Sequence, residues 1–462
     1  MDDFKLGGSE TSSTDCGDRE YVEIDPLYNA DVIGFEQTLL AAFDARTADL
    51  LRIALHIYAV DRLTRRDRRS TWSCRTRELK LAVPVSDMEF WRSPHVHHLV
   101  RGALELLSDD LWDIRFRRSE VRQEALLPCL PLDERVEDVF LFSGGLDSVA
   151  GAAAHLATTS RRQLAVTVLH KSLPQKSCSE LLQRLQSRFD QSIPWGRLGT
   201  ALIEPGRFDQ QETSQRCRAF LFVAAGIAAA AAKGANRVLM FESGTGAINA
   251  PLMAGMATGA RTTKSSHPHF LRKMSELASL ICERRVTVTL PHWQRTKAEL
   301  VKGLVDLGLG HAALQSLSCA HLPRRTGHRQ CGICAACITR RQALAYAGIG
   351  EPDDAYEYDI FASDPSRIPP EHKREDLKAV LNQVLDFESI GPSLALTPKL
   401  RHWLLGTQII SHEDEANPWL EVLWRYRCEW VQLAHAHRGA ALPWAGRLIQ
   451  QDTEHYANAS GF

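Results

Sequence analysis

Residues 139–151 read VFLFSGGLDSVAG and indicate how the central part of the chain folds. The apolar run 139–142 is typical of a buried strand, and the small apolar residues from Val149 onward predict a helix. Between them lies the polar turn 143–148, which contains two consecutive glycines. A strand, a glycine-rich turn and a helix N-terminus together present free backbone N–H groups at the positive end of a helix dipole. Because glycines put no Cβ between this backbone and a ligand, the stretch predicts a binding site for an anion such as a phosphate.

This loop differs from the two commonest nucleotide-binding loops. It lacks the Gly-Lys-Ser/Thr ending of a Walker loop, and it lacks a third glycine at the spacing of a Rossmann loop. Instead, Asp147 lies within the turn. A carboxylate next to a phosphate is explained if Mg²⁺ lies between the two, so we expect a magnesium-dependent site. The alternative is a plain strand–turn–helix connection that binds nothing.

Length and composition indicate a soluble globular protein of two or three domains, with 462 residues, 44% hydrophobic and 24% charged. No apolar stretch reaches membrane-spanning length, and the first twenty residues are acidic and polar, so we expect a cytoplasmic protein without a membrane partner. A formal net charge of −1 does not favour nucleic acid as a ligand. Eleven cysteines without an export signal indicate thiols and metal ligands rather than disulfides.

The chain divides into four expected parts. Residues 1–20 are rich in Gly, Ser, Thr and Asp and predict a disordered N-terminus. Residues 21–131 predict a small α+β domain, residues 132–350 a nucleotide-binding α/β domain, and residues 351–462 a helical C-terminal extension.

Within these parts, strands are expected where apolar residues run continuously or alternate, and helices where they recur at helical spacing. The expected strands are 51–60, 79–85, 111–116, 139–142, 164–169, 197–203, 237–241 and 286–290. The expected helices are 93–107, 149–156, 180–189, 214–233, 373–387, 398–410, 419–437 and 448–456. The alternation after residue 132 predicts a parallel, doubly wound sheet with helices on both faces, whose ligand lies beyond the carboxyl ends of the strands.

Four cysteines form a second strong signal: Cys319, Cys331, Cys334 and Cys337. The last three have the spacing CxxCxxC. Four thiolates close a tetrahedral zinc site, and a zinc ion with four protein ligands is structural rather than catalytic. An iron–sulfur cluster is the alternative, but one ligand lies upstream and no proline follows Cys337, so zinc is favoured.

The two motifs together resemble those of the QueC family, the 7-cyano-7-deazaguanine synthases, which belong to the PP-loop ATP pyrophosphatases. The resemblance rests on SGGLDS at 143–148, on Ser318-Cys319, and on CGICAACITR at 331–340. The stretch TKAE at 296–299 is similar to a TKxE stretch of that family. The likeness extends over about residues 139–350, and it implies the adenine nucleotide alpha hydrolase-like fold.

The resemblance implies an ATP-dependent ligase that forms C–N bonds. QueC enzymes adenylate the carboxylate of 7-carboxy-7-deazaguanine, let ammonia displace AMP to give an amide, and dehydrate the amide to a nitrile with a second ATP. The implied cofactors are ATP, Mg²⁺ and Zn²⁺, with Asp147 as the catalytic residue near magnesium. The implied ATP-binding residues are Leu141, Phe142, Ser143, Gly144, Gly145, Leu146, Asp147 and Ser148.

The flanking regions and the residues around the two motifs look like QatC, the QueC-like component of the Qat anti-phage defence system. This likeness implies that the acceptor of the activated deazaguanine is either ammonia or an amine of a partner protein from a defence operon. We expect Glu242 and Asn249 to read the purine edge, because carboxylate and amide groups pair with base donors and acceptors. Arg216 and Arg218 are expected to bind the substrate carboxylate or ATP phosphates; the alternative is that both face water near a helix start.

Two other functions stay open at this point. A tRNA-modifying PP-loop pyrophosphatase of the thiolation type would need RNA binding and a catalytic cysteine pair outside a metal site, and the near-neutral charge and the four-cysteine cluster count against it. A non-enzymatic assembly factor could keep the nucleotide fold as a scaffold, but it would not need Asp147.

Overall fold

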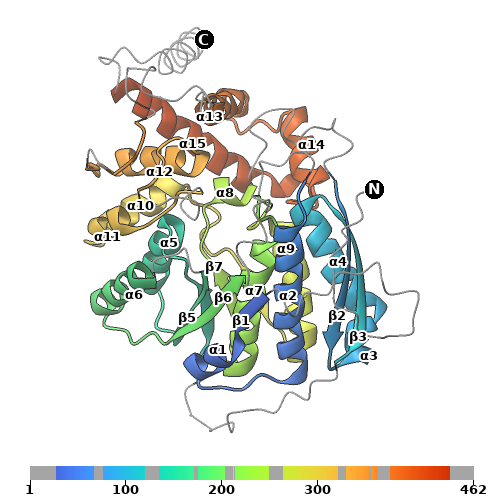
Figure 1. Ribbon diagram of the computed structural model, residues 1–462. Helices are drawn as coiled ribbons and strands as arrows, with labels where there is room; N and C mark the ends of the chain where they lie inside the picture. The colour runs from blue at the N-terminus through green and yellow to red at the C-terminus, as the bar shows by residue number, and fades with distance from the viewer. Residues whose placement is uncertain are drawn as a thin grey trace.

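The computed structural model describes residues 28–66, 76–119, 135–170, 175–202, 212, 214–248, 264–320, 329–352, 355–359, 361 and 375–436. The predicted disordered N-terminus, the predicted domain boundary at residue 131 and the predicted helix 448–456 lie outside these residues. The described part is a mixed α/β structure in which helices surround a mostly parallel six-stranded sheet (Figure 1).

The sheet has the strand order β1-β6-β5-β4-β7-β8. Its strands are β1 (Tyr28–Asp31), β4 (Asp138–Leu141), β5 (Gln163–His170), β6 (Trp195–Leu202), β7 (Arg237–Met240) and β8 (Thr287–Thr289). All neighbours are parallel except β1, which pairs antiparallel with β6. The chain moves outward from β4 to β6 and then returns to the other side of β4 as β7, so the strand order reverses between β4 and β7. Ligands of parallel α/β sheets bind at such a reversal, beyond the carboxyl ends of the strands.

Helices cover both faces of the sheet because successive strand residues point to opposite sides. Phe140 and Phe142 belong to a hydrophobic cluster on one face, and Val139 and Leu141 to a cluster on the other. The first face carries α5 (Leu146–Leu156), α6 (Gln175–Phe189), α10 (Lys297–Asp306), α11 (Gly310–Gln315) and α12 (Ala335–Tyr346). The second face carries α1 (Val32–Leu39), α2 (Ala45–Leu63), α7 (Arg218–Lys233) and α9 (Pro268–Cys282) (Figure 1).

The predicted strand at 51–60 is wrong, because these residues lie in the middle of helix α2. The helix packs against α7 on one side and β2 on the other, so nearly every side chain of the run LRIALHIYAV is buried. An all-round apolar helix has no amphipathic period, and periodicity alone does not separate it from a buried strand. The signal for its start was Asp44, whose side chain accepts a hydrogen bond from Thr47 N.

The other predicted elements of the first half are confirmed with small shifts at their ends. A second sheet consists of β2 (Glu78–Val85) and β3 (Leu111–Arg118), which pair in parallel, with α3 (Met88–Arg92) and α4 (Pro94–Ser108) between them in the chain. The predicted helix 214–233 begins at Arg218, because residues 214–217 form a turn that leads into α7.

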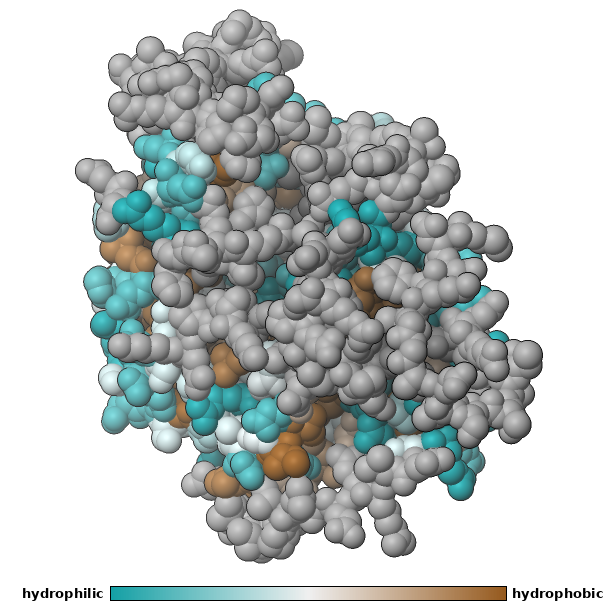
Figure 2. Space-filling view, viewed as in Figure 1, coloured by the Kyte–Doolittle hydropathy of each residue, from teal (hydrophilic) through white to brown (hydrophobic). Residues whose placement is uncertain are grey.

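Helices dominate after residue 350, as predicted. They are α13 (Glu375–Asp386), the short 3₁₀ helices η7 (Phe387–Ile390) and η8 (Glu413–Glu415), α14 (Pro398–Gly406) and α15 (Asn417–Ala436). Helix α15 crosses above α12 and α8 (Gly244–Ile248), at the end of the molecule where β7 leads into α8 (Figure 1). In the part of the chain that the structure describes, no helix has the combination of length and hydropathy that crossing a bilayer requires. Among the described residues visible on the drawn face, polar ones predominate, and the largest hydrophobic patch lies near its lower end (Figure 2).

Candidate active site

The predicted strand, turn and helix are found in that order, but the connection from β4 to α5 spans only residues 142–145. Leu146, Asp147 and Ser148, predicted as part of the turn, form the first turn of α5. Gly144 has φ +72°, and a Cβ at this position would lie 2.8 Å from Cys178 Sγ, so both the backbone conformation and the space require glycine. Leu141 and Phe142 are buried in the core, and the Phe142 carbonyl accepts a 2.6 Å bond from Thr167 Oγ1. Because both side chains are buried, only the main chain of Leu141 and Phe142 could contact a nucleotide.

Hydroxyl groups organise the turn itself. Ser143 Oγ accepts from Gly145 N at 3.3 Å, and Ser148 Oγ donates to Gly145 O at 2.9 Å. Helix α5 has no cap from its own N-cap residue, which is Gly145. Its first N–H group, at Leu146, instead donates to Ser318 Oγ at 3.3 Å. A residue next to the first cysteine of the metal motif therefore caps the phosphate-loop helix.

Asp147 forms a buried ion pair with Lys297, with Nζ 2.7 Å from Oδ2 and both side chains more than four-fifths buried. Lys297 is the first residue of α10. Its neighbours explain the TKAE stretch, because the Thr296 side chain and the Glu299 side chain form a reciprocal capping box at the start of this helix. The motif thus fixes where α10 begins and delivers the lysine to Asp147. The TKAE stretch carried part of the resemblance to QueC, but no local pattern predicted a role for Lys297.

Glu242 joins the pair. It follows β7, on the other side of the point where the strand order reverses, and it is half-buried. Removal from water and the neighbouring Asp147 carboxylate raise the pKa of Glu242 to about 8, although Lys297 opposes this shift. Burial lowers the pKa of Lys297, but the two carboxylates outweigh that effect and the net pKa is raised. Two carboxyl groups therefore share one cation at the carboxyl end of the sheet.

This donor set fits Mg²⁺, which prefers oxygen ligands and binds through one or two carboxylates plus substrate phosphates. Asp147 Oδ1 is buried and has no hydrogen-bond partner, although Oδ2 is paired. A buried acceptor without a donor is costly unless something else binds it. Asp147 and Glu242 would hold the ion, and Lys297 would be free to meet phosphate oxygens.

The four cysteines of the second motif come together. The Sγ atoms of Cys319, Cys331, Cys334 and Cys337 all lie within 4.8 Å of one another, and all four residues are buried. A tetrahedral zinc ion with Zn–S bonds of about 2.3 Å separates its sulfurs by about 3.8 Å. Cys331 Sγ and Cys337 Sγ are 3.8 Å apart. The cluster therefore fits a structural zinc ion, which would hold residues 319–337 together.

Backbone groups around the cysteines support the same reading. Cys331 N and Cys334 N donate to the sulfurs of Cys319 and Cys331, at 3.3 and 3.4 Å, as befits anionic thiolates. Gly332 has φ +78°, and a Cβ there would lie 2.0 Å from Tyr358 O. The glycine of CGICAAC is thus required by close packing against residues 355–359.

The metal motif and the phosphate loop are in direct contact. Leu317 N donates to Gly144 O at 3.2 Å, and Ser318 N donates to Gln330 Oε1 at 2.9 Å. Arg340, the last residue of the motif, is buried and donates to Ser316 Oγ at 2.7 Å and to Ala313 O at 2.8 Å. The cysteine cluster therefore supports the strand of chain that borders the loop.

The arginines expected to bind substrate have other contacts. Arg216 is buried, and its Nη1 donates to Ser108 O at 2.7 Å and lies 3.4 Å from Asp109 Oδ2, at the end of α4. The Arg218 guanidinium stacks on the Phe222 ring, 4.7 Å from its centroid. Asn249 lies outside the described residues. The roles of these three residues stay predictions.

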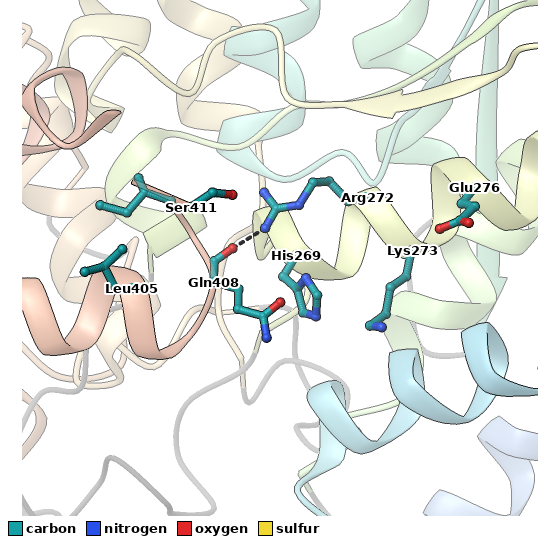
Figure 3. A pocket seen from close by; sticks show the side chains of 8 residues that line it. His269, Arg272, Lys273, Glu276, Leu405, Gln408 and Ser411 are labelled. Atoms are coloured by element: carbon teal, nitrogen blue, oxygen red, sulfur yellow. Dashed lines mark hydrogen bonds between the residues drawn. The ribbon is translucent and has the colours of Figure 1, made fainter. Parts of the chain in front are cut away.

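A cavity of about 480 Å³ lies elsewhere, between α9 and the end of α14 (Figure 3). Its lining combines basic and polar side chains: His269, Arg272, Lys273, Glu276, Leu405, Gln408, Ile410 and Ser411. The Arg272 guanidinium donates to the main-chain oxygen of Gln408, so it is used in packing (Figure 3). Burial lowers the pKa of His269 to about 4, which leaves this histidine neutral. None of the loop residues lines this cavity.

Comparison with known proteins gives one family. Residues 255–348 match the model of the queuosine biosynthesis protein QueC. This region contains Lys297 and the four cysteines, and the phosphate loop precedes it. A search of curated proteins found no match. The match shows that residues 255–348, which include the four cysteines, are similar to the corresponding part of QueC.

Proposed function

We propose that the protein uses ATP to adenylate the carboxylate of a 7-deazaguanine, such as 7-carboxy-7-deazaguanine. The observation that carries this proposal is the convergence of Asp147, Glu242 and Lys297 beside the loop 143–148, within a chain that matches QueC. A lysine and two carboxylates at the end of a phosphate loop suit a magnesium-bound triphosphate.

In this proposal the substrate carboxylate oxygen attacks the α-phosphorus of ATP, and the bond from that phosphorus to the β-phosphate oxygen breaks. The products are an acyl adenylate and pyrophosphate. When bound, Mg²⁺ neutralises phosphate charge. The N–H groups at the start of α5 face the phosphates, and Lys297 shifts from Asp147 to the leaving pyrophosphate. Each of these groups supplies position and charge rather than covalent chemistry.

An amine then attacks the acyl carbon and expels AMP, which forms the C–N bond. With ammonia the product is an amide, and a second ATP can remove its oxygen to give the nitrile. We propose, from the likeness to QatC, that the acceptor is an amine of a partner protein in an anti-phage defence system. Use of ATP and a metal site built from four thiols would suit a cytoplasmic location.

Cys178 is relevant to the alternative function, a tRNA-modifying pyrophosphatase of the thiolation type that needs catalytic cysteines. It lies next to the loop, with Sγ 3.5 Å from Ser143 O. Burial raises the pKa of its thiol to about 11, so it stays protonated at neutral pH and is a poor nucleophile. Its chemistry favours packing against Gly144 over sulfur transfer.

The test is AMP release. Protein with ATP, MgCl₂ and 7-carboxy-7-deazaguanine should form AMP, and omission of the deazaguanine should abolish it. Asp147→Asn should be inactive while keeping its fold and its zinc. Substrate-independent AMP formation, or full activity of Asp147→Asn, would contradict the proposal.

A further inference from the structure

The C-terminal helix α15 lies beyond the residues that match QueC, yet it contacts both segments that carry the partners of Asp147. The Trp419 ring lies 4.1 Å from the Trp293 ring, four residues before Lys297. Val422 packs against Gly244, two residues after Glu242, so closely that a Cβ there would lie 2.9 Å from Val422 Cγ1. These two segments are also bonded to each other, from Gly244 N to Arg295 O at 2.8 Å.

Glu429, also on α15, contacts Thr296, the N-cap residue of α10. Its carboxyl group accepts hydrogen bonds from Thr296 Oγ1 and, at 3.2 Å, from Gln342 Nε2. Thr296 Oγ1 also accepts from Glu299 N at 3.1 Å, which is its capping bond. A hydroxyl group has one proton to donate, so Glu429 is the acceptor that orients the Thr296 hydroxyl toward its capping role.

Arg425, one turn earlier on α15, binds the other half of the capping box. Its Nε lies 2.7 Å from Glu299 Oε1, and its Nη2 donates to Gln294 O. Both capping side chains of α10 are therefore held by α15. Lys297 directly follows the N-cap residue, so the position of its main chain depends on this cap.

We propose that Glu429, with Arg425, positions Lys297 against Asp147, which makes α15 a required part of the active-site frame. The inference rests on the proposed function only for the use of Lys297 in phosphate binding. Glu429 acts through Thr296 and α10 and is a positioning residue. The chain from Glu429 to Thr296 to Lys297 to Asp147 consists entirely of direct contacts or adjacent residues.

The experiment measures how fast an amine-reactive reagent modifies Lys297, by mass spectrometry of its peptide, relative to Lys302. Lys302 is on the same helix and is about half exposed, so it reports the general behaviour of α10. In the intact protein Lys297 should react slowly, because the paired carboxylates raise its pKa. Glu429→Ala should raise the Lys297-to-Lys302 ratio about threefold to tenfold, since one pKa unit changes the free amine tenfold.

Three further variants make the result specific. Glu429→Gln keeps an acceptor for Thr296 and should keep the wild-type ratio, and Gln432→Ala, at an exposed position on α15, should do the same. Arg425→Ala removes a half-exposed side chain and should raise the ratio even if Glu429→Ala fails to fold. An unchanged ratio in folded Glu429→Ala or Arg425→Ala, or a raised ratio in Glu429→Gln, would overturn the inference. Absence of AMP formation by the wild type would instead count against the proposed function alone, because the labelling needs no substrate.

Discussion

Glu242 is the residue whose ionisation differs most clearly from that of an exposed glutamate. Its pKa rises from 4.5 to about 8 on folding, so between these pH values the folded protein keeps a proton that the unfolded chain releases. Stability is therefore lost as pH rises through this window. Glu242→Gln has no proton to lose, and we expect it to be more stable than the wild type by up to about 5 kcal/mol at pH 9 and equally stable at pH 4.

Thermal melts of both proteins across this pH range check the prediction. Added MgCl₂ should stabilise the wild type more than Glu242→Gln, because the variant lacks one of the two carboxylates that would hold the ion. Equal melting temperatures at pH 9 would show that Glu242 ionises normally and is not coupled to Asp147.

Lys297 offers a direct comparison with a neighbour on the same helix. Lys297→Met should lower the rate of AMP formation by about a hundredfold or more, the scale of losing one group that stabilises developing charge. Lys302→Met should stay near the wild-type rate, because Lys302 is about half exposed and forms a surface ion pair with Asp306. Steady-state assays of the two variants decide the point, and equal rates would remove Lys297 from the mechanism.

Most of what could be predicted about the candidate active site came from short local sequence motifs. The loop is one short stretch and the four cysteines all lie within residues 319–337, and the cysteines do converge. Glu242 was expected to read a purine edge, but its position beside Asp147 depends on two strands becoming neighbours. The ion pair of Lys297 with Asp147 joins residues 150 positions apart, and no local pattern encodes such a contact.

At the level of elements, the cap of α5 is supplied by a distant segment. Ser318→Ala removes the acceptor of Leu146 N, and losing such a cap costs about 1 kcal/mol. We expect the loop to be held less firmly and to bind ATP less tightly, which would raise the KM for ATP and leave kcat nearly unchanged. Ser389→Ala, at an exposed serine of η7, is the matched control and should leave KM unchanged. An unaltered KM in Ser318→Ala would mean that the loop holds its shape without this bond.

Strands and helices were predicted correctly where their burial leaves a recognisable sequence pattern. This pattern is periodic when one face is buried and a continuous apolar run when a strand is buried on both faces. The parallel sheet, its strand positions and the C-terminal helices follow from alternation of apolar runs with amphipathic segments. One exception, α2, is buried on several sides, and its tertiary surroundings rather than its periodicity determine that it is a helix. Helices α9, α10 and α12 were not predicted. The edge strand β1 was also not anticipated, because four residues paired antiparallel with β6 leave little pattern.

At the scale of the molecule, the cysteine cluster and the nucleotide loop form one connected body. Cys334→Ser should lose most of the bound zinc, since three thiolates hold the ion less well than four. Because Leu317 and Ser318 contact the loop, ATP binding should weaken together with metal content. Metal analysis and equilibrium ATP binding on the same preparation test this coupling; unaltered ATP binding by metal-free protein would separate the two sites.

The central claim is that Asp147 and its partners drive transfer of AMP to a deazaguanine carboxylate. Exchange of labelled pyrophosphate into ATP measures this step alone, because formation of the acyl adenylate is reversible and needs no amine. We predict exchange that requires 7-carboxy-7-deazaguanine and Mg²⁺, is present without ammonia, and vanishes in Asp147→Asn. Absence of exchange in folded, zinc-loaded protein, or release of ADP and phosphate in its place, would contradict the account.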